Sequence, residues 1–367
     1  MFSNIKKQLG FGCMRLPMNG NEIDMVEFTK MVDYFMENGF NYFDTDHVYI
    51  QGKSELALKE ALFKRYNRED IIFADKLSSS TFKDENGIYE IFNKQLEATG
   101  AKYFDFYLLH ALSKRNISHY EDNNAFNVVK EFKEKGLIKH IAMSFHDTAD
   151  VLDDILTSHP EVEVVQLQFN YADYYDLNVQ SKACYDVCVK HNKKVIVMEP
   201  VKGGSLVDIP DAAREVFDEL NNGSYASYAI RFCASFDNIF MVLSGMSNMD
   251  QMVDNISYMK DFKPLDDIEL NAVKKVQEIL NSIDLVKCTK CRYCVDGCPK
   301  NILIPQLISS LNKKRTFPNS KGDFDYKWYI KDHGKASDCI KCGKCEIICP
   351  QKLPIRNILD EIKEIFE

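Results

Sequence analysis

Near its C-terminus the chain carries one cysteine spacing twice, and this repeat limits what that segment can fold into. Each copy reads C-x2-C-x2-C-x3-C-P, and the two copies hold eight of the twelve cysteines. They are Cys288, Cys291, Cys294 and Cys298, followed by Pro299, and then Cys339, Cys342, Cys345 and Cys349, followed by Pro350. Three thiolates from a tight loop and a fourth from a distant segment can converge on one small volume.

A cubane iron–sulfur cluster needs such a convergence of four thiolates. In proteins with two clusters, the fourth cysteine of each run ligates the cluster of the other run. We therefore expect two [4Fe–4S] clusters with crossed ligand sets: Cys288, Cys291, Cys294 and Cys349 for the first cluster, and Cys339, Cys342, Cys345 and Cys298 for the second.

Zinc and disulfides are the alternatives for these cysteines. Zinc knuckles use cysteine pairs, and leave the third cysteine and the cysteine before proline without a role. Disulfides need an oxidising compartment, whereas the N-terminal residues lack an apolar segment of secretory length. No apolar run approaches the length of a membrane helix. The sequence predicts a soluble, cytoplasmic protein that handles single electrons.

Charge is divided unevenly along the chain. The net charge of −9 combines about +6 from Val286 onward with about −15 before it. Basic residues beside anionic clusters explain the positive tail without a partner, while a docking face for ferredoxin or another acidic electron carrier is the alternative. Nucleic acid is not an expected partner, because the basic residues are interleaved with acidic ones and aromatic stacking platforms are sparse.

Short apolar runs alternate with helical patterns over most of the 367 residues. Strands joined by crossover helices are parallel, and eight such units indicate a closed barrel, with an open doubly wound sheet as the alternative. We expect an α/β fold: a (β/α)8 TIM barrel over residues 1–285, then a small α-helical ferredoxin-like domain over residues 286–367. The expected strands are Leu9–Cys13, Asn41–Thr45, Ile71–Lys76, Asp105–His110, Ile138–Ser144, Val164–Asn170, Lys194–Glu199 and Phe240–Gly245.

Polar side chains follow three successive strands of the expected barrel. They are Asp44, Tyr49, Lys76 and His110, and barrel enzymes carry their catalytic groups at these strand ends. Reduction of a carbonyl places negative charge on oxygen, so a proton donor must lie beside it. A lysine ammonium can make a tyrosine a better donor, and an aspartate keeps that lysine charged.

At these residues the chain resembles the aldo/keto reductase family. The motif of the second strand reads Asp44-Thr45-Asp46-His47-Val48-Tyr49, with Gly52, Ser54 and Glu55 after it. The resemblance implies that Tyr49 is the general acid, that Lys76 and Asp44 tune it, and that His110 orients the substrate. Over the whole chain, the sequence is similar to the subgroup with a C-terminal two-cluster ferredoxin domain.

Positions that bind the family's nicotinamide cofactor are also implied by the resemblance. They are Ser144, Gln166, Ser244, Gly245, Ser247, Asn248, Gln251 and Asn255. Phe145 replaces the asparagine that the family pairs with this serine. The helix after Gly245 is expected to offer N–H groups to a phosphate. Because no Arg or Lys lies between Ser244 and Asn255, NADH, weakly bound NADPH and a flavin all stay open.

The sequence therefore favours an oxidoreductase that acts on a small carbonyl or alcohol with NAD(P)H. Asp46 and His47 replace smaller family residues and indicate a more polar pocket mouth. Hydride transfer moves two electrons, whereas each cluster carries one, so the coupling stays open. The clusters either stabilise the tail, or receive electrons from ferredoxin through an adapter, or belong to a non-catalytic electron-transfer subunit of a larger complex.

Overall fold

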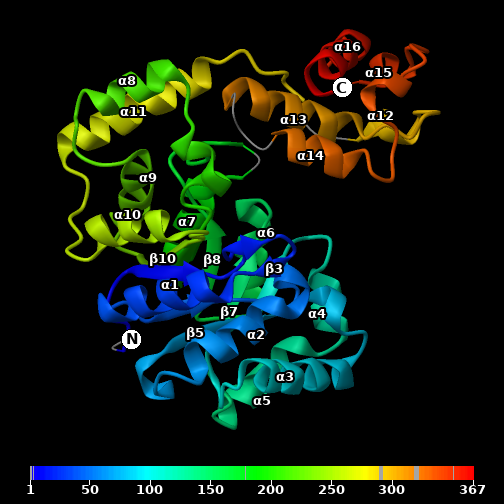
Figure 1. Cartoon of the computed structure of the whole chain (residues 1–367). Helices are drawn as coiled ribbons and strands as arrows, with labels where there is room; N and C mark the ends of the chain where they lie inside the picture. The colour runs from blue at the N-terminus through cyan, green and yellow to red at the C-terminus, as the bar shows by residue number, and fades with distance from the viewer. Residues whose placement is uncertain (1, 3, 178, 289–291, 318–321, 350) are drawn as a thin grey trace. The chain divides into compact units, whose positions relative to one another are not determined.

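The computed structural model describes the chain except for residues 1, 3, 178, 289–291, 318–321 and 350 (Figure 1). The chain divides into two compact units. The first comprises Met1–Gly203 and Gly223–Leu270, and the second comprises Gly204–Asn222 and Asn271–Glu367. Helix α11 (Asp267–Ser282) runs across this division. The domain boundary expected between residues 285 and 286 stays a prediction.

Eight parallel strands form a closed barrel in the first unit. Strand β1 pairs with both β10 and β4, which closes the ring and excludes the open sheet. The predicted (β/α)8 fold is thus confirmed. Around the barrel the strands are β1 (Leu9–Gly12), β10 (Ile239–Ser244), β9 (Lys194–Met198), β8 (Val164–Gln168), β7 (Ile138–Phe145), β6 (Phe104–Leu112), β5 (Ile72–Leu77) and β4 (Tyr42–Asp44).

Helices connect the strands and surround the barrel (Figure 1). Helix α1 (Met25–Glu37) shows how the sequence specifies these helices. The Asp24 side chain caps its N-terminus by accepting from the N–H groups of Val26 and Glu27, and the helix is amphipathic, with its apolar face buried. The other helices of this unit are α2 (Lys53–Leu58), α3 (Glu85–Thr99), α4 (Ile117–Asp122), α5 (Ala125–Glu134), α6 (Ala149–Ser158), α7 (Ser181–Lys190), α9 (Tyr225–Ala234) and α10 (Met249–Met259).

The region before α1 differs from the sequence expectation. Residues 22–38 have a helical period in the sequence, which predicts a helix that begins at Glu22. In the structure, β2 (Met18–Asn19) and β3 (Glu22–Ile23) instead form a short antiparallel hairpin before the helix. Gly20 has a φ of 62° there, which suits the tight turn. Strands of two residues are too short for an alternating pattern, so the sequence gives no signal for them.

Alternate residues of each strand fill the barrel interior. Successive strand residues point to opposite faces, so every second residue points inward. The resulting core is apolar: Tyr42, Ile72, Ala74, Phe106, Leu108, Ala142, Val164, Ile196, Met241 and Leu243.

The second unit is helical and contains an internal repeat. Helices α13 (Ile304–Thr316) and α16 (Ile355–Phe366) each begin six residues after the fourth cysteine of a run. Asn301 and Lys352 occupy equivalent positions before these helices, and both have left-handed backbones, with φ of 50° and 49°. The other helices are α8 (Asp211–Asp218), α12 (Tyr293–Asp296), α14 (Gly322–Tyr329) and α15 (Lys344–Ile348). No helix in the described part of the chain has the length and apolar character of a membrane span.

Candidate active site and cysteine-lined cavities

A polar layer lies above the apolar core of the barrel. On each strand, the polar residue lies two positions after an apolar residue that points into the barrel. Because side chains two residues apart on a strand point to the same face, the polar side chains also point into the barrel. The members of the layer come from five neighbouring strands, β4 to β8: Asp44, Lys76, His110, Ser144 and Gln166. Because the strands are parallel, the polar layer lies at their carboxyl ends, where barrel enzymes place their catalytic groups.

Lys76 and Asp44 form a buried ion pair in this layer. Lys76 Nζ donates to Asp44 Oδ1 at 2.5 Å and to the Thr45 carbonyl at 2.7 Å. Gln166 Nε2 donates to the other Asp44 oxygen at 3.2 Å. Burial lowers the pKa of Lys76, but the nearby Asp44 carboxylate and other anions raise it by more, so the net shift is upward. The lysine therefore stays an ammonium ion.

Tyr49 lies at the start of the turn Tyr49–Gly52, with Lys76 Nζ 4.8 Å from the centre of its ring. Burial raises the pKa of the phenol more than the ammonium lowers it, and the net value is about 12. The sequence predicted a phenol made acidic by its lysine neighbour. The ammonium does act in that direction, but desolvation is the larger effect.

His110 lies on the other side of Tyr49, with the two ring centres 6.1 Å apart. Its Nδ1 contacts Ser78 Oγ at 2.6 Å and Asp46 Oδ2 at 2.8 Å. Burial raises the pKa of Asp46, but the hydrogen bond and charge of His110 outweigh this effect and lower it. A carboxylate therefore fixes the proton on Nδ1 and leaves Nε2 for a substrate.

The sequence predicted that Asp46 and His47 make the mouth of the pocket more polar. This prediction is wrong for Asp46, because its side chain is fully buried. His47 is partly exposed and pairs through Nδ1 with Glu55 Oε2 at 2.8 Å. Both polar side chains are thus engaged within the protein. The sequence did not identify Asp46 as the partner of His110, because β4 ends at Asp44 and strand alternation does not extend to the turn that follows.

Ser144 is fully buried, and its Oγ accepts a hydrogen bond from the Ala111 N–H at 2.7 Å. Ala111 has a φ of 54°, which is uncommon for a residue with a Cβ. The pairing of β6 with β7 shifts register between Leu109 and Leu112. The local distortion follows His110 directly, and the buried serine helps to hold it.

The remaining cofactor positions surround the turn from β10 to α10. Asn255 Nδ2 donates to Ser244 Oγ at 2.6 Å, and Gln251 Oε1 accepts from the Ser247 N–H at 2.8 Å. Asn248 caps α10, and Gly245 is exposed. An ideal Cβ on Gly245 would lie 3.8 Å from the Gly12 carbonyl oxygen. These two glycines therefore lie close together and leave the backbone uncovered by side chains at the end of the barrel.

Helix α10 offers fewer free N–H groups than the sequence predicts. Met249 N–H donates to Glu27 Oε1 at 3.0 Å, and Gln251 N–H donates to Asn248 Oδ1 at 2.9 Å. Two of the N–H groups that were expected to bind a phosphate therefore already donate to side chains of this protein.

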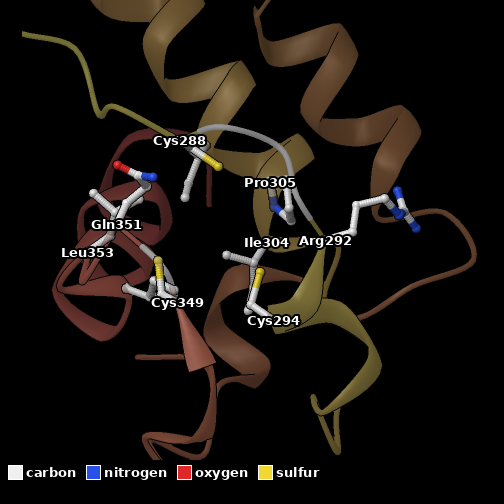
Figure 2. Close-up of a pocket in the computed structure, with 10 residues that line it drawn as sticks. Cys288, Arg292, Cys294, Ile304, Pro305, Cys349, Gln351 and Leu353 are labelled. Carbon is white, nitrogen blue, oxygen red and sulfur yellow. The ribbon is translucent and has the colours of Figure 1, made fainter. Parts of the chain in front are cut away.

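In the second unit, cysteines from both runs surround each of two cavities. The first cavity has about 330 Å³ of empty space and is lined by Cys288, Cys294 and Cys349, with apolar residues of α13 (Figure 2). Cys291, the fourth predicted ligand, lies outside the described residues. Two cysteines of the first run thus meet the last cysteine of the second.

The second cavity has about 350 Å³ of empty space and shows the reciprocal arrangement. Its cysteines are Cys339, Cys342 and Cys345 from the second run and Cys298 from the first. Every predicted ligand of the second cluster therefore lines one cavity.

The donor chemistry and backbone of these cavities fit an iron–sulfur cluster. The four cysteines of the second cavity form no disulfide with any described residue. In the described ranges, no three His, Cys, Asp or Glu side chains lie close enough to hold a single metal ion. Arg292 and Gly343, each between the second and third cysteine of its run, have left-handed φ of 67° and 76°. Left-handed residues in such loops turn N–H groups toward an anionic cluster.

The fold and the two cavities define the class of protein: a barrel oxidoreductase that carries an iron–sulfur domain. Residues 8–278 match the model of the aldo/keto reductase family, and residues 287–354 match that of a 4Fe-4S dicluster domain. The chain belongs to the aldo/keto reductase family and is an oxidoreductase with a C-terminal dicluster domain.

Curated relatives match one part or the other. An uncharacterized oxidoreductase, YqkF of Bacillus subtilis (strain 168), is 24% identical over 282 residues, which cover 68% of this chain and 86% of the relative. The alpha 1 subunit of the acetyl-CoA decarbonylase/synthase complex of Methanosarcina acetivorans is 29% identical over 107 residues, or 28% of this chain and 11% of the subunit.

Solved structures support the barrel fold. The holo form of the aldo-keto reductase AKR11C1 from Bacillus halodurans has a TM-score of 0.62 at 23% identity, covering 74% of this chain and 92% of its own. An aldo-keto reductase from Klebsiella pneumoniae, solved in complex with NADPH, has a TM-score of 0.60 at 14% identity, covering 74% and 95%.

Proposed function

We propose that the barrel reduces a small carbonyl compound to an alcohol, or catalyses the reverse oxidation, with NADPH or NADH. The observation that carries this proposal is the buried Lys76–Asp44 pair beside Tyr49 at the carboxyl ends of adjacent strands. This arrangement places a proton donor, a fixed positive charge and a histidine at one end of the barrel.

The proposed roles follow from the contacts. Tyr49 gives its proton to the developing alkoxide, and the Lys76 ammonium stabilises the phenolate that remains. Asp44 keeps the lysine charged and in place. His110 orients the substrate oxygen, and Asp46 holds the histidine ring in place through its contact with Nδ1.

Nicotinamide would supply the hydride. Ser144 and Gln166 at the strand ends are proposed to hold the nicotinamide. Residues 244–255 are proposed to hold the phosphate and adenine of the cofactor, where Gly245 and the neighbouring Gly12 leave the backbone open. Two solved relatives from Klebsiella pneumoniae contain NADPH or NADP, which supports NADPH for this chain. The flavin that the sequence left open has no such support.

We further propose that the second unit holds two [4Fe–4S] clusters with the crossed ligand sets. Between them, two clusters can store the two electrons that a hydride carries. Cys342 is exposed at the second cavity, and this favours exchange of electrons with an external carrier over a purely stabilising role.

Anaerobic turnover tests the barrel proposal. The intact protein is given NADPH or NADH with a panel of small aldehydes and ketones, and the alcohol product is identified. We expect one alcohol formed for each nicotinamide oxidised, with at least one carbonyl compound. Absence of turnover with every compound and both nicotinamides, in protein that binds them, would overturn the proposal.

A further inference from the structure

The described cysteines of the two cavities differ in exposure. Cys294 of the first cavity is buried, and Cys288 and Cys349 are only partly accessible, while Cys291 lies outside the described residues. Cys342 of the second cavity is exposed. Since electron transfer between proteins needs a close approach of the two redox centres, Cys342 marks a short path from solvent to the second cavity.

Large exposed apolar side chains lie close to this cysteine in the sequence. Ile340 lines the second cavity and is 58% exposed, while Ile347 and Ile348 on α15 are 88% and 50% exposed. Lys344 also lines the cavity and precedes these two isoleucines by three and four positions on the helix, which places it next to them. We call Ile340, Lys344, Ile347 and Ile348 the α15 face.

Basic residues accompany the isoleucines. Lys300, Lys344 and Arg356 line the second cavity, and Lys341 lies beside Cys342. Arg356 pairs with Glu346 at 2.7 Å, and Lys341 with Asp360 at 2.8 Å. Among the described residues, neither Lys300 nor Lys344 has an ion-pair partner.

Basic residues alone are explained by the charge of a loaded cluster, because thiolate-bound clusters are anionic. The isoleucines are not, since an exposed aliphatic side chain does nothing for a nearby anion and is unfavourable in water. An apolar centre with a basic rim is instead typical of a surface that binds an acidic protein transiently.

We propose that the α15 face binds a small acidic one-electron carrier protein of the ferredoxin type. In this transfer the reduced carrier would give up one electron to the oxidised cluster that Cys298, Cys339, Cys342 and Cys345 would hold, with no bond formed or broken. Transient electron-transfer complexes use small interfaces, so a few isoleucines and lysines suffice. This inference rests on the proposed clusters but not on the barrel chemistry.

Stopped-flow mixing of the full-length protein with reduced ferredoxin, without oxygen, tests the α15 face. Bleaching of the protein's clusters gives a second-order rate constant. We expect Ile347→Glu to lower it about ten-fold or more, because the new carboxylate repels the carrier and removes the apolar contact. Ile347→Lys should lower it less, and added salt should slow the wild-type reaction.

Ile365→Glu is the matched control, because Ile365 is also exposed (40%) but lies on α16. It should leave the rate constant unchanged. Iron content and reduction by dithionite must match the wild type in each variant, which separates docking from loss of a cluster. Equal rates for Ile347→Glu and Ile365→Glu would overturn the proposal. If Ile347→Lys and Ile347→Glu slowed the reaction equally, the inference that the partner is acidic would be wrong. Carbonyl turnover, measured separately, distinguishes these failures from a failure of the barrel function.

Discussion

Asp46 shows how one buried carboxylate shapes the candidate active site. It contacts both Ser78 Oγ, at 2.9 Å, and His110 Nδ1, at 2.8 Å, and has no exposed surface. The sequence located the catalytic candidates from residue type and strand position. It could not show that Asp46 turns inward, because that depends on where β4 ends and the following turn begins.

Asp46→Asn should therefore weaken catalysis without unfolding the barrel. The amide is similar in size but carries no charge, so it holds the His110 ring less firmly, and a hydrogen bond to a charged group contributes about 1.5–3 kcal/mol. We expect kcat/KM for carbonyl reduction to fall about ten-fold or more. Steady-state kinetics measures this, with Ser78→Ala, which removes the other contact of His110 Nδ1, as the comparison. An unchanged kcat/KM in Asp46→Asn would contradict the assigned role of the carboxylate.

Lys76→Met should slow alcohol oxidation at every pH. The pKa of Tyr49 is about 12, and the ammonium lowers it, so removing the lysine raises it further. Carbonyl reduction needs the protonated phenol and should stay flat through neutral pH. Alcohol oxidation needs the phenolate, so it should rise with pH and be slower in the variant at each pH.

An unpaired Asp44 would complicate this test, because a buried charge without a partner destabilises the fold by about 3–5 kcal/mol. The double variant Asp44→Asn/Lys76→Met removes both charges. Thermal unfolding of the single and double variants separates lost stability from lost chemistry. Wild-type rates of alcohol oxidation in the folded double variant would contradict the role of the pair.

At the scale of elements, all eight strands were predicted, because each is an apolar run followed by a helical pattern. Their ends differ from the prediction by one or two residues. Helices α4 and α8 were missed, since α4 has six residues and α8 has only two buried side chains, Ala213 and Phe217. Short helices carry too little periodicity to stand out.

Gly334 controls the packing of the segment between Cys298 and α13. A Cβ on Gly334 would lie 2.2 Å from the Lys300 carbonyl oxygen, whereas one on Gly297 meets nothing within 4 Å. Gly334→Ala should push this segment away and destabilise the unit by about 1–3 kcal/mol. Gly297→Ala should leave it intact. Iron content and thermal unfolding measure the difference, and equal iron content and stability in both variants would contradict it.

At the scale of the whole molecule, the chain joins two kinds of redox chemistry. The spacing of the cysteines predicted the dicluster domain, because ligand geometry restricts the spacing itself. The helical pattern of the segment between the two cysteine runs predicted that this domain is helical. The path of electrons between the units could not be predicted, since the residues of each unit describe only its own chemistry. The same holds for the substrate, which the loops at the strand ends select.

Cys345→Ser separates the two chemistries. It removes one ligand of the second cavity, so iron content should fall. If hydride passes directly between nicotinamide and carbonyl, as proposed, turnover per folded barrel should persist while reduction by ferredoxin is lost. Parallel loss of both activities, in protein whose barrel remains folded by circular dichroism, would show that carbonyl turnover depends on the clusters.

Hydride transfer in Tyr49→Phe tests the central claim most directly. The variant keeps the ring beside Lys76 but lacks the proton donor, and general acids contribute about 10²–10⁴-fold. In a single turnover without oxygen, we predict that NADPH oxidation by a carbonyl substrate slows at least about a hundred-fold, with nicotinamide binding and iron content unchanged. Tyr89→Phe, which removes a hydroxyl bonded to Glu131 on the helical surface, should match the wild type. A Tyr49→Phe protein that oxidises NADPH at the wild-type rate would contradict the account.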